Sequence, residues 1–262
     1  MPGLGLGLGL GRGGGGVPFD PSLYTWVDGA YTGETVDGTF DCPYKTMEAI
    51  RLISPNLSGT KATIYVKPGT TGIYDEDFSL NKDGYTFVAY GDVTLRGSGA
   101  QVLRTYSGCN MTYIGFTIDA EATKATFIEH QYGTVNFTNC AFIAPNTTQC
   151  TCLNVQSNDT PVFATFTGCA FTGNYGSGRV FRDLPLLDST KNVTITIRNC
   201  VIDVVCGQAI LFSNQGTNGQ STILVDGCTI TKNTAAEDFY VLRPGSYTFT
   251  NNTIVYPSIV NK

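Results

Sequence analysis

The sequence has little of the chemistry on which metal sites and histidine-based catalysis depend. Only 14% of its 262 residues are charged, and His130 is the single histidine. One imidazole cannot supply the ligand sets of most transition-metal sites, and it leaves a histidine-based triad dependent on one residue. We expect His130, which follows Glu129, to be a solvated turn residue rather than a general base. The sequence predicts no metal site and no cofactor.

The chain also lacks long apolar runs and an excess of basic residues. No apolar run approaches the ~20 residues of a membrane-spanning helix. The formal net charge is −5, whereas nucleic-acid binding needs clustered Lys and Arg. The first residues have no basic n-region, and their alternating glycines do not suit the apolar helix of a secretion signal. We therefore expect a protein that binds no nucleic acid, is not embedded in a membrane and uses no secretion signal.

Disulfide and zinc frameworks are not indicated either. Nine cysteines cannot all pair within one chain, and no C-x-x-C spacing occurs. Cys150 and Cys152 lie only two residues apart. Cysteines without evident partners are typical of proteins that stay in a reducing compartment. We expect a fold that does not depend on disulfides.

What the sequence does contain is a repeat. Seven segments share the pattern apolar, polar, turn-former, core residue, small or polar, apolar. They are Tyr90–Leu95, Tyr113–Ile118, Phe137–Phe142, Phe166–Phe171, Ile197–Ile202, Val225–Ile230 and Phe249–Ile254. Asn or Gly fills the third place in six of the seven, and successive segments start 23 to 31 residues apart.

A second series of short β-rich runs lies between these segments. It is centred on Leu103, Phe127, Leu153, Phe181, Leu211 and Tyr240. Each period therefore holds at least two strands, with the alternation and the Val, Ile, Thr, Phe and Tyr content typical of β-structure. A period of about 27 residues is too short for a propeller blade of ~40–45 residues and fits one coil of a parallel β-helix. The sequence predicts an all-β, single-stranded parallel β-helix of about seven or more coils.

One repeat position is expected to line the interior of the coils. It holds, in successive segments, Phe116, Cys140, Cys169, Cys200, Cys228 and Asn252. A row of thiols could bind a metal or form disulfides. Stacked neighbours point the same way, however, and a free cysteine behaves as a small buried hydrophobe. We expect an interior ladder in preference to disulfides.

A helix upstream of the repeats is expected to cover the first coil. Asp41 can cap a helix whose first turn holds Pro43, and Pro55 ends it. Its apolar positions recur three residues apart, at Met47, Ile50 and Ile53. A solenoid needs such a cap because its first coil would otherwise expose apolar side chains and strand edges. The chain then divides into an arm over residues 1–16, a lead-in segment over 17–40, a capping helix over 41–55 and the β-helix over 56–262.

A series of motifs in the first third of the chain resembles a known superfamily. V-D-G and D-G-T are followed by P-Y-K-T-M-E-A-I, by T-I-Y-V-K-P-G-T and by an acidic tripeptide, Asp75–Asp77. This order is similar to the N-terminal region of the pectate-lyase-like right-handed parallel β-helix superfamily. That superfamily includes pectin methylesterases, bacterial surface proteins, and phage tailspikes and related virion proteins. The resemblance implies a right-handed β-helix and leaves the activity open, because one fold hosts many functions.

The catalytic pattern that this resemblance would imply is incomplete. Pectin methylesterases use two aspartates, an arginine and flanking glutamines, but the nearest stretch, Thr172–Phe181, has no carboxylate where one aspartate should be. A second family stretch is matched only by Leu242–Gly245, which contains Arg243. Arg182 and Asp183 alternate on a strand and should face opposite sides. The remaining acidic candidates, for glycan or cation contacts, are Asp75, Glu76, Asp77, Asp119 and Glu121. A solvated loop is the favoured interpretation of Asp75, Glu76 and Asp77, and a simple strand end is the alternative for Asp119 and Glu121. No catalytic residue is assigned.

The first sixteen residues favour an anchoring role. In an extended chain Leu4, Leu6, Leu8 and Leu10 would form one apolar edge and the intervening glycines a bare backbone edge. We expect this arm to order when it docks on another protein; a disordered tail is the alternative.

Together these features predict a non-enzymatic component of a virus particle. The expected protein is a bacteriophage head fibre, capsid decoration or tail-associated β-helix, assembled in the host cytoplasm and located on the virion. Its expected partners are capsid, portal or tail proteins, two further copies in a homotrimer, and cell-surface polysaccharide. The alternative is a carbohydrate-active enzyme of the pectin-esterase, polysaccharide lyase or hydrolase type.

Overall fold

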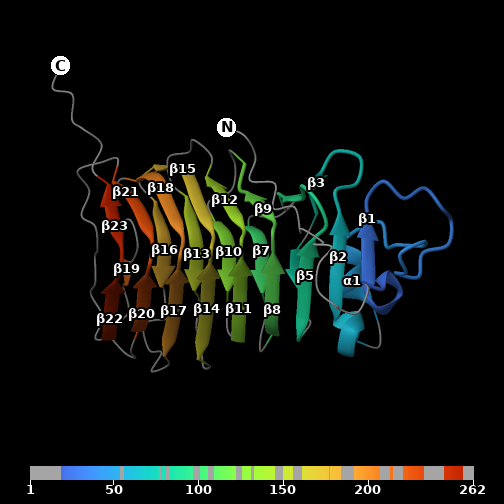
Figure 1. Cartoon of the computed structure of the whole chain (residues 1–262), viewed down its shortest axis with the longest axis horizontal. Helices are drawn as coiled ribbons and strands as arrows, with labels where there is room; N and C mark the ends of the chain where they lie inside the picture. Colours follow the sequence, from blue (N-terminus) through green and yellow to red (C-terminus); the bar gives the residue numbers. More distant parts are fainter. Residues whose placement is uncertain are drawn as a thin grey trace, which may run out of the picture.

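The computed structural model is a parallel β-solenoid whose coils stack along one axis (Figure 1). It describes residues 19–53, 56–76, 78–80, 83–96, 101–105, 109–121, 126–130, 133–144, 150–155, 161–176, 178–183, 192–206, 213–214, 221–232 and 245–255. The arm over residues 1–16, with Leu4, Leu6, Leu8 and Leu10, lies outside these ranges, as do Asp77, Leu211, Tyr240 and Arg243.

Each full coil contributes one strand to each of three parallel sheets, so it holds three strands where the sequence predicted at least two. Sheet A contains β1 (Thr25–Asp28), β2 (Thr63–Lys67), β5 (Tyr85–Ala89), β8 (Cys109–Ile114), β11 (Gly133–Thr138), β14 (Val162–Thr167), β17 (Val193–Arg198), β20 (Ser221–Asp226) and β22 (Gly245–Thr250). Sheet B contains β3 (Ile73–Tyr74), β6 (Thr94–Leu95), β9 (Thr117–Asp119), β12 (Ala141–Ala144), β15 (Ala170–Gly176), β18 (Val201–Cys206), β21 (Thr229–Lys232) and β23 (Thr253–Val255). Sheet C contains β4 (Phe78–Leu80), β7 (Gln101–Thr105), β10 (Thr126–His130), β13 (Thr151–Val155), β16 (Arg179–Asp183) and β19 (Ser213–Asn214). The predicted parallel β-helix is confirmed.

The repeated segments form the corner between sheets A and B. Six of them place one residue with positive φ at this corner, in the order Gly115, Asn139, Gly168, Asn199, Gly227 and Asn251. Glycine and asparagine are the residues that adopt this left-handed conformation at least cost, which explains the third place of the pattern. The first segment is an exception. Phe87, not Tyr90, pairs with Tyr113, so that segment matches the others only from Val93 onward.

Glycine and asparagine alternate at this corner for a steric reason. A Cβ added to Gly168 would lie 2.4 Å from Asn139 Oδ1, and one added to Gly227 would lie 2.6 Å from Asn199 Oδ1. The side chain of each asparagine occupies the space beside the corner glycine of the next coil. A side chain on that glycine position would therefore clash with it.

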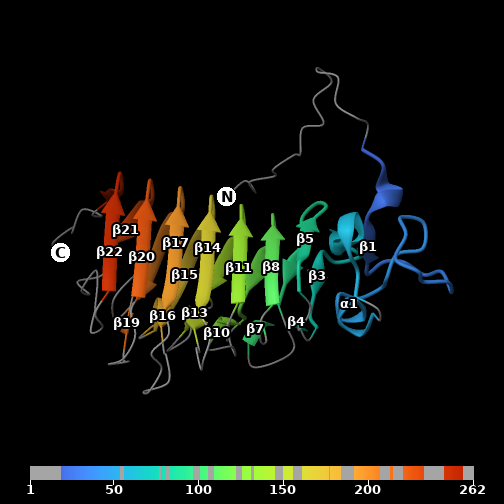
Figure 2. The same cartoon turned by 90° about the horizontal axis from the view of Figure 1, so that it is seen from below.

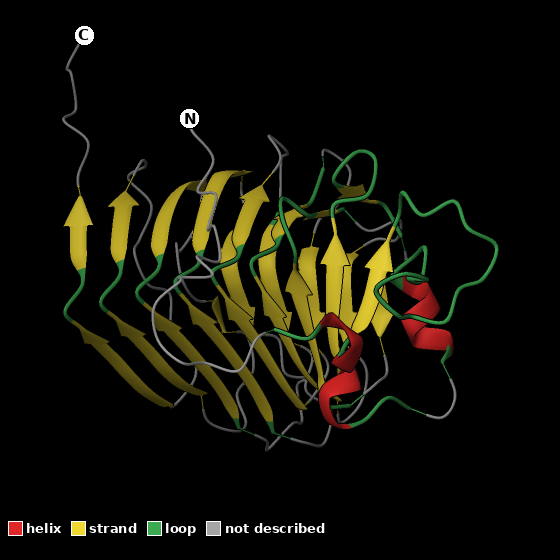
Figure 3. Cartoon of the chain, turned by 45° about the vertical axis from the view of Figure 1, so that its right-hand side comes forward, coloured by secondary structure: helices red, strands yellow, loops and turns green. Residues whose placement is uncertain are grey.

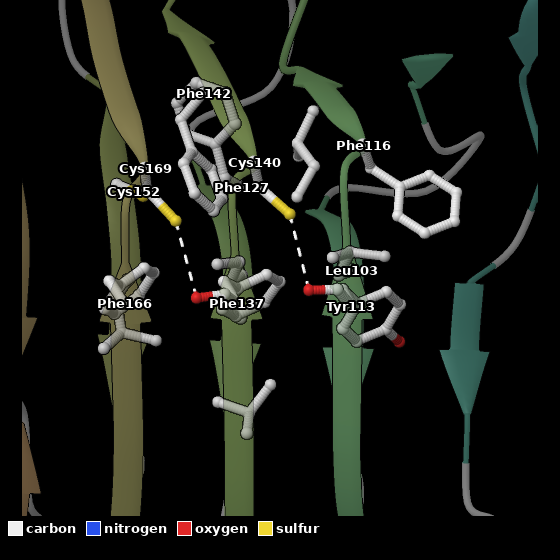
Figure 4. Packing of buried hydrophobic residues seen from close by; sticks show 14 of the residues in the cluster. Leu103, Tyr113, Phe116, Phe127, Phe137, Cys140, Phe142, Cys152, Phe166 and Cys169 are labelled. Carbon is white, nitrogen blue, oxygen red and sulfur yellow. Dashed lines mark hydrogen bonds between the residues drawn. The ribbon is translucent and has the colours of Figure 1, made fainter. Parts of the chain in front are cut away.

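Five of the six residues at the predicted interior position are buried, Asn252 is half-buried, and the cysteine side chains bond from coil to coil (Figure 4). Cys140 Sγ donates to the carbonyl oxygen of Tyr113 and Cys169 Sγ to that of Phe137, both at 3.5 Å. The N–H of Cys169 in turn donates to Cys200 Sγ at 3.4 Å. All nine cysteines are free thiols, so no disulfide contributes to the stack.

Asn252, the last residue of the interior row, makes the same two hydrogen bonds as the cysteines, through its side-chain amide. Asn252 Oδ1 accepts from the N–H of Cys228 at 2.9 Å, and its Nδ2 donates to the carbonyl of Val225 at 3.0 Å. Rings stack beside this row, with centroids of Phe87, Tyr113, Phe137 and Phe166 separated by 5.2 to 5.3 Å.

The predicted helix over residues 41–55 is much shorter. α1 covers Glu48–Leu52, its N-cap residue is Met47, and Asp41 takes no part in capping it. Met47 and Ile50 are buried in the core cluster, and α1 lies at the β1 end of the solenoid (Figure 3). Among the described residues, two further helical turns are the 3₁₀ segments η1 (Pro21–Leu23) and η2 (Gly59–Ala62). Within the described ranges, no helix is long and apolar enough to cross a membrane.

His130 is an interior residue, and the expectation of a solvated turn is wrong. Its side chain is fully buried in β10, Nε2 lies 3.2 Å from the carbonyl oxygen of Gly133, and Nδ1 contacts Thr105 Oγ1. Burial lowers the pKa of His130 to about 4. A neutral, enclosed imidazole of this kind belongs to the core and cannot reach a substrate.

The alternation at the corner yields a direct test of the packing. Gly115→Ala and Gly168→Ala both place a side chain in the left-handed region, which costs ~1–2 kcal/mol. The Gly168 variant should cost about 1 kcal/mol more, because only its Cβ meets Asn139; the Cβ at Gly115 comes no closer than 3.7 Å to Ala89. Chemical denaturation measures both, and the excess should vanish in an Asn139→Gly background. Equal losses for the two single variants would contradict this packing.

Candidate functional site

The predicted acidic tripeptide does not form a carboxylate cluster in the described residues. Glu76 Oε2 accepts a hydrogen bond of 2.8 Å from the backbone N–H of Glu48, at the start of α1. Burial raises the pKa of Glu76, while its bonds to the Glu48 and Met47 amides act in the opposite direction. Asp75 is exposed. Glu76 therefore caps the start of α1, which is the role that the sequence predicted for Asp41.

A cleft of about 280 Å³ opens beside this loop. Its polar lining includes Lys45, Thr70, Thr71, Tyr74, Asp75 and Glu76. The Tyr74 hydroxyl donates to the Lys67 carbonyl at 2.7 Å and accepts from the Gly29 N–H at 2.9 Å. Burial raises the pKa of Tyr74 to about 12. These bonds brace the wall of the cleft, and they leave Tyr74 unsuited to act as a base.

Asp119 and Glu121, which were expected to contact a glycan or a cation, form ion pairs with Arg96 of the same chain. Arg96 Nε lies 3.2 Å from Asp119 Oδ2, and Arg96 Nη1 lies 3.3 Å from Glu121 Oε1. The N–H of Glu121 also donates to Asp119 Oδ1 at 3.0 Å, which fixes the turn. Across the described parts of the chain, no three His, Cys, Asp or Glu side chains gather closely enough to hold a metal ion.

The sequence reasoning missed a polar cluster on the outward face of sheet C. Glu129, on β10, is only 5% exposed. Gln101 Nε2 donates to Glu129 Oε2 at 2.7 Å, and Arg104 Nε lies 3.0 Å from Glu129 Oε1. Asn154 is the register partner of Glu129 on the next strand, and its Oδ1 is buried without a hydrogen bond. A carboxylate, a guanidinium and two amides thus lie on one face of neighbouring coils.

This cluster was missed because the strands of sheet C do not alternate strictly. Two adjacent residues of β10, Phe127 and Ile128, are both buried in the core, as are Val102 and Leu103 on β7. Strict alternation starting from a buried Phe127 would place the Glu129 side chain in the interior and the His130 side chain on the surface. The structure shows the reverse. In the pairing of β10 with β7, the register partner of Leu103 is Ile128 and not Phe127. No sequence signal marks this break in the alternation.

Chemically, the cluster can hold a polar ligand more readily than it can transform one. Glu129 is a single carboxylate, paired with Arg104. General acid–base hydrolysis of a glycoside uses two carboxylates on either side of the reacting bond. Among the side chains that the structure describes on this face of sheet C, Glu129 is the only acid. The side chains of Arg182 and Asp183 lie outside the description, so their predicted opposite orientation stays a prediction.

Comparison with known proteins finds likeness at the level of structure alone. No protein-family model and no curated protein sequence matches the chain. Two crystal structures of the pectin methylesterase from Aspergillus niger, in deglycosylated and penultimately deglycosylated forms, do match. They superimpose with TM-scores of 0.50 and 0.51 at 14% identity, and the alignments cover 90% of this chain and 87% of theirs. At this identity the likeness extends to the fold only. The chain therefore shares the parallel β-helix fold of these two structures.

Proposed function

We propose that this protein is a non-enzymatic structural or adhesion component of a virus particle, such as a bacteriophage head fibre, capsid decoration or tail-associated β-helix. The observation that carries the proposal is the structural use of its acidic side chains. Glu76 binds the start of α1, Asp119 and Glu121 share Arg96, and Glu129 is paired with Arg104. Carboxylates that act as acids, bases or nucleophiles must instead face the reacting bond of a substrate.

Two further features support assembly on a particle inside a host cell. The nine free thiols suit a protein that folds and assembles in a reducing cytoplasm. The stacked coils form a rod, and the arm over residues 1–16 anchors this rod to capsid, portal or tail proteins. In this proposal the protein is a homotrimer on the virion, and its polar sheet C face contacts polysaccharide of the host surface.

Removal of the arm tests the attachment. Protein lacking residues 1–16 should keep the circular dichroism spectrum and melting temperature of the full chain, because the core cluster begins at Val27. It should be absent from purified particles by mass spectrometry and immunogold microscopy. A full-length variant with Leu4, Leu6, Leu8 and Leu10 changed to Ser keeps the length and should be lost too. Normal incorporation of the truncated protein would refute the anchoring role.

A carbohydrate-active enzyme is the second candidate. The Glu129, Arg104 and Gln101 cluster favours it, because these residue types can bind sugar hydroxyls and acidic sugars. The structural neighbours are pectin methylesterases, which favour it weakly at 14% identity.

An activity assay separates the two candidates. Purified protein should release no methanol from pectin, no unsaturated product and no reducing ends from acidic polysaccharides above the level of a buffer control. The matched variant is Glu129→Gln, which keeps the shape of the side chain and removes its charge. Turnover by the wild-type protein that falls by at least ~100-fold in Glu129→Gln, with an unchanged melting temperature, would establish the enzyme instead.

A further inference from the structure

Six aromatic rings gather on the outward side of the first strands of sheet A. These strands lie at one end of the row that sheet A forms along the solenoid (Figure 2). Trp26 on β1 and Tyr65 on β2 are register partners, and both alternate with core residues, so their side chains point away from the interior. The group, which we name the aromatic platform, consists of Phe19, Tyr24, Trp26, Phe40, Tyr65 and Tyr90. None of the six belongs to the interior core cluster.

Trp26 is the base of the platform. Its side chain is fully buried, its ring stacks on that of Tyr65 with centroids 4.9 Å apart, and its Nε1 donates to the Pro21 carbonyl oxygen at 2.8 Å. Phe19 stacks on Tyr24, with centroids 5.3 Å apart. Because the rings hold one another in place, they have little conformational freedom to lose when a ligand covers them.

The outer rings of the platform are accessible to solvent. Phe19 is 40% exposed, Phe40 39% and Tyr90 44%. No described ring stacks on Tyr90, which meets Trp26 and Tyr65 edge to face, with centroids 5.3 and 6.2 Å apart. Neighbouring exposed rings that form one apolar patch are typical of a binding surface.

The tyrosines of the platform also present their hydroxyl groups. In the described part of the chain, the hydroxyls of Tyr24, Tyr65 and Tyr90 form no hydrogen bond with the protein. Tyr74 and Tyr85, in contrast, each accept a hydrogen bond from a backbone N–H. Burial raises the pKa of Tyr65, and the neighbouring hydroxyls of Tyr24 and Tyr90 raise it further. The three hydroxyls are thus close together and available to a ligand.

The charged groups beside the platform do not favour an acidic ligand. Lys67 Nζ lies 4.2 Å from the centroid of the Phe40 ring and 3.5 Å from Asp28 Oδ2. Lys61 Nζ donates to two backbone carbonyl oxygens, at 2.8 and 3.0 Å. Both lysines are thus engaged within the protein. Asp20, at the start of η1, is exposed and would repel a carboxylate or a phosphate.

We propose that the aromatic platform binds a chain of neutral pyranose sugars, as in an uncharged polysaccharide. A pyranose ring has an apolar face of C–H groups, which packs on an aromatic ring, and a rim of hydroxyl groups, which bond to other hydroxyls. The exposed rings and the free tyrosine hydroxyls of the platform offer both kinds of contact within one surface. The platform is built on β1, β2 and the segments that flank them, whereas the Glu129 cluster lies on sheet C.

The platform is independent of the proposed role on a virus particle. That role is measured by incorporation of the protein into particles, whereas sugar binding is measured on the purified protein. Incorporation without sugar binding would leave the particle role standing and remove the platform as a binding site. Sugar binding without incorporation would do the opposite.

The single tryptophan of the chain supplies a direct signal. Trp26 is the only Trp, so the indole fluorescence of the purified full-length protein reports on the platform. Titration with dextran, laminarin, galactomannan and hydroxyethyl cellulose, which are all uncharged, should change this emission in a saturable way with at least one of them. Polygalacturonate, the acidic comparison, should leave the emission unchanged. Affinity electrophoresis in gels that contain the polysaccharide gives the dissociation constant independently of the fluorescence.

Variants of one exposed ring show where the sugar binds. Tyr90→Ala should weaken binding at least ~10-fold, because it removes a ring that the sugar packs on. Tyr90→Phe keeps the ring and removes the hydroxyl, so it should weaken binding by only about 3-fold. The matched control is Phe163→Ala, which removes a ring of nearly the same exposure, 43%, from β14 of the same sheet and should leave the affinity unchanged. Circular dichroism shows whether the variants remain folded.

Saturable binding of a neutral polysaccharide that weakens in Tyr90→Ala and not in Phe163→Ala supports the proposal. Three results overturn it. The first is no binding of any of the four neutral polysaccharides, and the second is a change in Trp26 emission with polygalacturonate alone. The third is equal affinity of Tyr90→Ala and the wild-type protein, and a loss of binding in Glu129→Gln would then place the sugar on sheet C.

Discussion

The corner between sheets A and B is the constraint on which the rest of the structure depends. Every coil must turn there within one or two residues, and six coils do so with a residue of positive φ. This turn sets the register of both sheets, because a slip of one residue would exchange inward and outward side chains. The cysteine row lies directly after the turn. It satisfies the backbone groups that the turn exposes, through Cys Sγ atoms and finally through Asn252.

A consequence of this design is that function has to lie on the outside. The interior is filled by stacked rings, aliphatic side chains and free thiols, and its one histidine is neutral. The three outward faces then differ in chemistry, although one backbone repeat produces them all. Sheet A presents rows of threonine, whereas sheet C presents the Glu129 cluster.

The parts of the fold that follow from local repetition could be predicted from the sequence. The turn residue, the interior cysteines and the parallel β-helix all recur at fixed positions, and each coil repeats the signal. Features that occur once could not be predicted. Glu76 caps α1 from another loop, Arg96 forms ion pairs with both Asp119 and Glu121, and the break in alternation in β10 reverses Glu129 and His130. These depend on contacts between segments distant in sequence.

Amide hydrogen exchange tests the central claim most directly. The N–H groups of Cys169, Cys200 and Cys228 donate to side-chain atoms of the following coil, outside any strand. If the corner row locks the coils together, these amides should exchange as slowly as those in the middle of β17. Exchange as fast as in exposed turns, with the strands still protected, would show that the sheets alone hold the stack and that the corner does not set it.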